Sequence, residues 1–218
     1  MRNLTLETIF KKDSLLLLAK IFVPPSFFVV LLYVLGKIND VEFSYISRDP
    51  IQLLNGKPYI GILSNTGILF WCFTIATLFL SAKIARDLGR PKILYQFFFF
   101  AGLLTLLLLV DDFFLFHDVI FPDYLHASEI YFYIFYGLSA ASLLYFFRKV
   151  ILESDYILLL LAFALLSSSV LMDLDILFSL GIYLPGSLVI EDGCKFMGII
   201  SWFVYFIRIC YTNIKPVN

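Results

Sequence analysis

Charged residues are scarce in this chain. Only 15% of its 218 residues are Asp, Glu, Lys or Arg, whereas 61% are hydrophobic. In soluble domains about 25% of the residues are usually charged. The core of a soluble protein of this length cannot bury so many apolar residues, but a lipid bilayer can solvate them. A nucleic-acid partner is not expected. The net charge is −1, and the chain has no run of Lys and Arg that could contact a phosphate backbone. The composition predicts an integral membrane protein whose main partner is the lipid bilayer.

Cysteine, histidine and the common catalytic motifs are also sparse or missing. The three cysteines lie in or beside apolar stretches and form neither a disulfide framework nor a CxxC metal site. Two histidines are too few for a haem pair within the membrane or a histidine-rich iron centre. No GxxxxGK[ST], GxGxxG, GxSxG or HExxH motif is present, so nucleotide binding and nucleophile-elbow hydrolysis have no support.

Long apolar stretches are what the chain does contain. A helix needs about 20 mainly apolar residues to cross the hydrocarbon core of a bilayer. Marking where charge stops and restarts predicts six such helices, at about 14–36, 59–82, 93–116, 130–147, 156–180 and 189–210. We expect Pro24 and Pro25 to kink the first helix or to start a new helical segment there. The predicted fold class is all-α, a polytopic transmembrane helix bundle of about six spans that forms one domain over residues 1–218.

Basic residues predict the orientation of these spans, because they concentrate in cytoplasmic loops. They gather before span one, between spans two and three, between four and five, and after span six, as Lys11, Lys12, Lys83, Arg86, Arg90, Lys92, Arg148, Lys149, Arg208 and Lys215. These segments share one side if six helices alternate. We therefore expect both termini to be cytoplasmic, in a plasma or inner membrane. The two halves of the chain show no convincing repeat.

Ionisable side chains inside spans are costly and mark functional sites by default. Asp111, Asp112, His117 and Asp118 end the third predicted span, Asp173 and Asp175 lie in the fifth, and Glu191, Asp192 and Lys195 open the sixth. The predicted topology places all three groups toward the external leaflet. Three helices thus bring carboxylates, an imidazole and an ammonium to a similar depth.

Helical spacing refines this prediction. At 100° per residue, Asp118 is only about 20° from Asp111 in projection, whereas His117 is about 120° away. Asp173 is the inward acid of span five, because it continues a small polar face from Ser169. In span six Lys195 stands four residues after Glu191 and three after Asp192, so we predict a salt bridge to one of these two carboxylates.

The pattern predicts a site for a cation or for protons. Its candidate ligands are Asp111, Asp112, His117, Asp118, Asp173 and Glu191, with Asp192 and Lys195 as the salt-bridge residues. Oxygen-rich ligand sets suit hard cations such as Ca²⁺, Mg²⁺ or Mn²⁺, so a divalent metal is the candidate cofactor. The competing interpretation is that these acids mark solvated helix ends and that the imidazole is a hydrogen-bonded bystander.

Three classes of function remain open. The first is a cation- or proton-binding protein that acts in transport or gating. The second is a non-catalytic subunit of a membrane complex, and the third is a metal-dependent membrane enzyme in which Lys195 orients the substrate. The sequence names no ion or substrate, and it leaves open a homo-oligomer or a larger membrane complex.

Overall fold

The computed structural model describes residues 12–126, 128, 130–173 and 187–215, and the side chains of these except 12–15, 17 and 118. All regular structure within these ranges is helical. The contacts group the chain into two compact units, Met1–Ile60 and Gly61–Asn218, and each is described by itself. The sequence predicts a single domain, and that remains a prediction.

The first unit contains helix α2 (Lys12–Ile38) and two short helices, α3 (Phe43–Ser47) and α4 (Pro50–Leu53). The helix α2 continues through Pro24 and Pro25, so the prolines do not begin a separate helix. The segment after α2 holds the short helices α3 and α4. The carboxylate of Asp49 caps α4 by accepting the backbone N–H groups of Ile51 and Gln52, at 2.8 Å and 3.2 Å.

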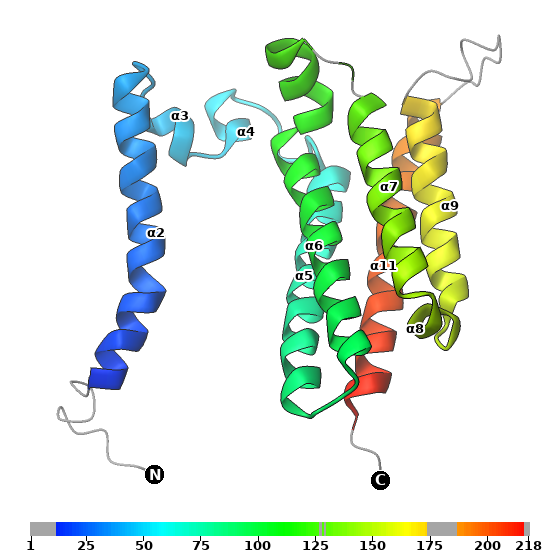
Figure 1. Ribbon diagram of the computed structural model, residues 1–218. Helices are drawn as coiled ribbons and strands as arrows, with labels where there is room; N and C mark the ends of the chain where they lie inside the picture. Colours follow the sequence, from blue (N-terminus) through cyan, green and yellow to red (C-terminus); the bar gives the residue numbers. More distant parts are fainter. Residues whose placement is uncertain (1–11, 127, 129, 174–186, 216–218) are drawn as a thin grey trace. The chain divides into compact units, whose positions relative to one another are not determined.

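The second unit is a helical bundle in which successive long helices alternate in direction (Figure 1). Its members are α5 (Ile62–Asp87), α6 (Lys92–Phe114), the π-helix η1 (Phe116–Tyr124), α7 (Ile130–Phe146), α8 (Arg148–Leu152), α9 (Tyr156–Asp173) and α11 (Ser187–Ile214). The ends of α6 and α9 and the beginnings of α7 and α11 lie at the same end of the bundle (Figure 1).

Five helices of the described chain are long and apolar enough to cross a membrane: the 18–38 part of α2, α5, α6, α9 and the 188–214 part of α11. The helix α7 is apolar but has only 17 residues. The predicted all-α membrane-type architecture is therefore confirmed. The exact count of six spans and the cytoplasmic position of both termini remain predictions. The last part of the predicted 156–180 span lies outside the described residues.

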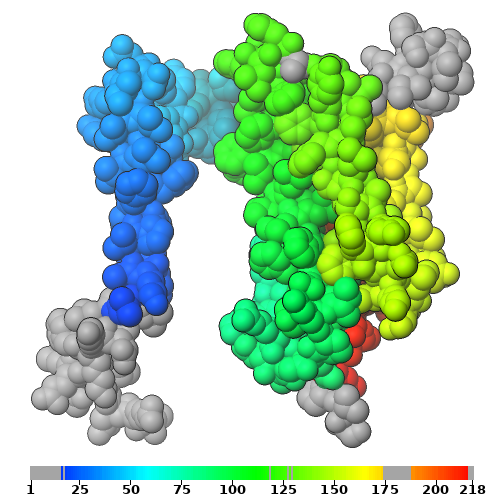
Figure 2. Space-filling model, viewed as in Figure 1, coloured from blue at the N-terminus to red at the C-terminus, as the bar shows by residue number. Residues whose placement is uncertain are grey.

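Aromatic side chains fill the core of the second unit. Trp71 of α5 and Trp202 of α11 are 2% and 1% exposed, and their rings meet edge to face at 6.1 Å. The Trp202 indole also donates a hydrogen bond to the Thr105 hydroxyl of α6, at 3.1 Å. Large apolar side chains are also exposed on the helices of this unit, among them Phe73, Phe99 and Leu138. Figure 2 shows the surface that α6 and α7 form on one side of the unit. An apolar core with an equally apolar exterior is what lipid solvates.

Candidate functional site

The site is built around a break in the helix that follows α6. Leu115 adopts a left-handed conformation, with φ of +54°, and it separates α6 from the π-helix η1. Left-handed backbone costs a non-glycine residue about 1–2 kcal/mol. The carbonyl of Leu115 then accepts the N–H groups of both Val119 and Ile120, at 2.9 Å and 3.0 Å. Strained residues and π-helical segments persist mainly where function requires them.

This break folds His117 back onto Asp111. One oxygen of the Asp111 carboxylate accepts the backbone N–H of His117 at 3.0 Å, and the other lies 2.7 Å from the imidazole Nδ1. Both side chains are buried, at 5% and 6% exposure. A carboxylate and an imidazole in contact inside an apolar bundle form a pair that can exchange a proton without leaving an unpaired buried charge.

Asp112, the next residue, joins three helices of the bundle. Its Oδ2 accepts the indole N–H of Trp71 from α5 at 2.8 Å, and its Oδ1 lies 2.8 Å from the ammonium of Lys195 on α11. The Asp112 side chain is only 12% exposed and that of Lys195 is 39% exposed. This carboxylate is therefore not a solvated helix end. The predicted salt bridge from Lys195 to Glu191 or Asp192 remains a prediction.

Asp173 closes the site from α9. Its Oδ2 accepts the hydroxyl of Tyr133, which comes from α7. The Tyr133 ring meets the His117 imidazole edge to face, with 5.4 Å between the ring centroids. Asp173 thus points into the bundle, as its spacing from the buried Ser169 predicts. The chain of contacts runs from Asp111 through His117 and Tyr133 to Asp173.

A buried hydroxyl lies beside this chain of contacts. The Tyr136 hydroxyl makes no hydrogen bond of normal geometry within the part of the chain that the structure describes. Its charged neighbours are the carboxylates of Asp111 and Asp112. Buried polar groups are nearly always hydrogen-bonded, and the neighbouring Asp111 carboxylate is the acceptor available to this hydroxyl.

The contacts above involve five of the residues that the sequence predicts for the site, in two sets: one runs from Asp111 to Asp173, and the other joins Asp112 with Lys195. Asp111, Asp112, His117, Asp173 and Lys195 all take part in the contacts above. Glu191 lies on the same helix as Lys195 and is half-buried, whereas Asp192 is exposed. The side chain of Asp118 and all of Asp175 fall outside the described residues. No three His, Cys, Asp or Glu side chains in the described ranges lie close enough together to hold a metal ion.

Three aromatic residues of the site are missing from the sequence prediction. Trp71, Tyr133 and Tyr136 lie in spans without charge, where aromatic rings are expected to face lipid. Their polar atoms are the signal that could identify them, because the N–H of a buried Trp and the O–H of a buried Tyr need a partner. Asp112 of α6 is the partner of Trp71, and Asp173 of α9 is the partner of Tyr133.

The fold and the site define a class, that of multi-span helical proteins with an ionisable network at one end of the bundle. Residues 26–209 match the family described as domain of unknown function (DUF8692), and the chain belongs to that family. No curated protein and no solved structure matches the chain.

Proposed function

We propose that this integral membrane protein binds a proton or a cation at the Asp111–His117 pair and uses that binding for transport or gating. The site comprises Asp111, Asp112, His117 and Asp173, with Asp118 and Glu191 as further acids, and it faces the external leaflet. The buried contact between Asp111 and His117 carries the proposal.

The charge balance of the site supports cation or proton uptake. Three carboxylates, Asp111, Asp112 and Asp173, stand against two groups that can be cationic, His117 and Lys195. With the imidazole protonated, this set carries one net negative charge; with the imidazole neutral, it carries two. Buried charge of one sign is expensive, so the site favours the state with the additional positive charge.

The positive charge can be a proton on the imidazole or a bound metal cation, and the contacts favour the proton. The Asp111 and Asp112 oxygens already contact protein groups, namely His117, Trp71 and Lys195. A metal would have to displace those groups, whereas a proton needs only the imidazole. Loss of that proton would weaken the hold of Asp111 on His117, and the strained turn at Leu115 gives this segment a route to a second conformation.

The test follows the protonation of His117 directly. The chain has two histidines, and His126 is exposed, so H126Q leaves a single imidazole to observe by NMR of isotope-labelled histidine in nanodiscs. The titration midpoint of His117 should move to lower pH in D111N, because removal of the carboxylate removes the charge that favours the imidazolium. The matched control is D87N, which breaks the exposed Lys83–Asp87 pair and should leave the midpoint in place.

Added ions separate the two forms of the proposal. Thermal stability of the parent and of D111N is measured with and without Ca²⁺, Mg²⁺ and Mn²⁺. An ion that stabilises the parent by mass action, and not D111N, assigns the site to that cation. If no ion does so, and His117 titrates identically in the parent and in D111N, the proposed proton or cation site is wrong. The alternative is then that the protein is a non-catalytic subunit of a membrane complex.

A further inference from the structure

A polar cavity lies at the opposite end of the Gly61–Asn218 unit from the Asp111–His117 pair. It has a volume of about 520 Å³ and is formed by the turn between α5 and α6, the connection between α8 and α9, and the last turns of α11. Its charged lining residues are Arg90, Glu153, Asp155 and Arg208. None of these residues belongs to the site described above.

Arg90 gives this cavity its binding capacity. Its Nη2 donates to the backbone carbonyl of Lys215 at 2.9 Å, which fixes the guanidinium, while its Nε is buried with no hydrogen-bond partner in the described structure. Arg208 differs, because its Nε donates to the Asp155 carboxylate at 2.9 Å. A buried guanidinium N–H of this kind calls for an acceptor, and the described residues do not supply one.

The beginning of α6 adds to the attraction for an anion at this point. The helix starts at Lys92, directly after Arg90 and Pro91, and no side chain caps it. The backbone N–H groups in the first turn of a helix carry partial positive charge and commonly bind phosphate. The buried Arg90 Nε and the helix start therefore point to the same ligand chemistry.

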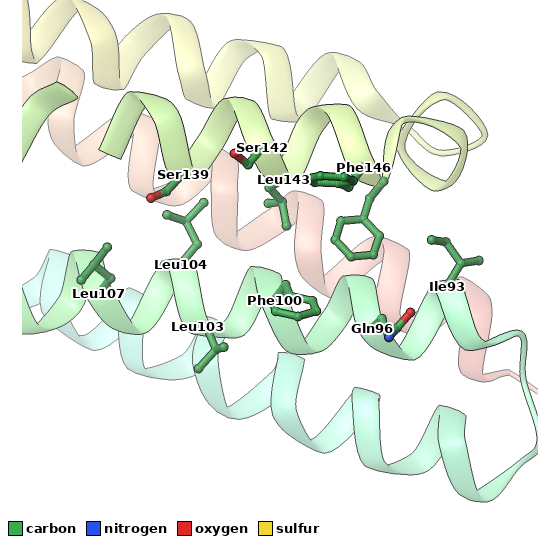
Figure 3. Close-up of a pocket in the computed structure, with 11 residues that line it drawn as sticks. Ile93, Gln96, Phe100, Leu103, Leu104, Leu107, Ser139, Ser142, Leu143 and Phe146 are labelled. Carbon is green, nitrogen blue, oxygen red and sulfur yellow. The ribbon is translucent and has the colours of Figure 1, made fainter. Parts of the chain in front are cut away.

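An apolar groove leads away from this cavity along α6 and α7. Its volume is about 660 Å³, and its lining runs on α6 from Ile93 to Leu107, a length of about 21 Å at the rise of an α-helix. Figure 3 shows Leu104 extending from α6 toward α7. The Phe147 ring, directly after α7, reaches back to α6, where its centroid lies 6.0 Å from that of the Phe100 ring. Ile93 lines both the groove and the polar cavity, so the two spaces meet at that residue.

We propose that the two spaces together bind one zwitterionic phospholipid, with its phosphate at Arg90 and an acyl chain along the α6–α7 groove. The groove lies between two helices of a membrane-type bundle and is lined mainly by Leu and Phe, as an acyl chain requires. The cavity at its end contains two arginines and two acids, which sum to zero charge and match a head group that carries both signs. Basic pockets between helices at the membrane surface are established positions for lipid head groups.

The test is a titration of the purified protein with dioleoyl phosphatidylethanolamine, followed by native mass spectrometry. R90Q should weaken binding of this lipid about tenfold, because a charge-assisted hydrogen bond to phosphate is lost. S142W should weaken it to a similar degree by filling the groove. The matched controls are R86Q, at the exposed end of α5, and S167W, on the exposed face of α9; both should bind within about twofold of the parent.

Two further probes identify which part of the lipid is bound. Dioleoylglycerol, which lacks the phosphate, and inorganic phosphate, which lacks the chains, should each bind at least about tenfold more weakly than the phospholipid. Equal binding of dioleoylglycerol reduces the site to an apolar groove, and equal binding of inorganic phosphate reduces it to an anion site; either result overturns the proposal. An affinity for the lipid that is unchanged in both R90Q and S142W also overturns the proposal. A protein dimer that S142W dissociates and R90Q does not would mean that a second copy of the chain occupies the groove, which overturns it as well.

Discussion

At the scale of single residues, the acids of this bundle are held by protein donors in place of water. Asp111 contacts His117 twice and is buried, and Asp112, which is partly buried, contacts Trp71 and Lys195. Removing one partner of such a group leaves a buried charge that water cannot reach. The individual contacts can therefore be measured as free energies of unfolding.

The contact between Asp112 and Lys195 should show a clear coupling. We expect K195M and D112N each to destabilise the protein by about 1–3 kcal/mol, and the double variant by less than their sum, because the second change removes a charge that the first had stranded. Unfolding of the four proteins in detergent measures the coupling, which should exceed about 0.5 kcal/mol. The pair Lys83 and Asp87 is the control: it is exposed and should couple more weakly.

The Asp111–His117 contact shows where prediction from sequence ends at this scale. On a continuous α-helix these two side chains are about 120° apart, so helical spacing separates them. The left-handed Leu115 breaks that periodicity and brings them to 2.7 Å. Leucine rarely adopts this conformation, so no residue type in the segment signals the break. The sequence places these acids at the end of a predicted span, but their partners depend on the backbone between them.

At the scale of helices, the close contact between α9 and α11 positions Asp173 and Lys195. A Cβ added to Gly198 of α11 would lie 2.8 Å from the Leu166 Cγ and 3.2 Å from its backbone nitrogen on α9. The two backbones therefore approach each other as closely as a glycine allows. Lys195 lies about one turn before Gly198, so the same contact supports the ion pair with Asp112.

We therefore expect G198A to destabilise the protein by about 1–3 kcal/mol, because a methyl group at this position forces the helices apart. G193A is the matched control on the same helix, where nothing lies within 4 Å of the added Cβ. That variant should be neutral or stabilising by up to about 1 kcal/mol, since alanine favours the helix over glycine. Thermal unfolding of both variants checks the difference; equal melting temperatures contradict close packing at Gly198.

The helices themselves follow from the sequence better than their contacts do. The predicted 93–116 span and α6 agree closely, because charge and proline mark where that span begins. The 189–210 span has charged residues in its first turns, yet α11 is helical through all of them, from Ser187 to Ile214. Lys195 can lie inside the helix because Asp112 of α6 supplies its counter-charge. The sequence pattern within a single helix cannot indicate a counter-charge that lies on another helix.

At the scale of the whole molecule, the topology depends on α7. With 17 residues it is about 25 Å long, a few ångströms less than the hydrocarbon core of a bilayer. Such a mismatch is tolerated by local thinning of the bilayer at modest cost. In the bundle α7 runs between the end that holds η1 and the end that holds α8, alongside the longer helices (Figure 1). We therefore expect α7 to cross the bilayer despite its short length.

If α7 crosses the membrane, the chain has six spans and its basic segments all face the cytoplasm. Topology reporters fused after Lys92 and after Arg148 should then read cytoplasmic, and one fused after Asp123 should read external. The reason is that the turn before α6 and the turn after α7 are both basic, and basic turns favour the cytoplasmic face. An external signal at Lys92 contradicts the orientation itself. The same side for Asp123 and Arg148 means that α7 does not cross, which leaves an odd number of spans and places the two termini on opposite sides. The position of the Asp111–His117 pair at the far end of α6 from Lys92 does not depend on whether α7 crosses, so the proton measurement on His117 and the topology measurement test separate claims.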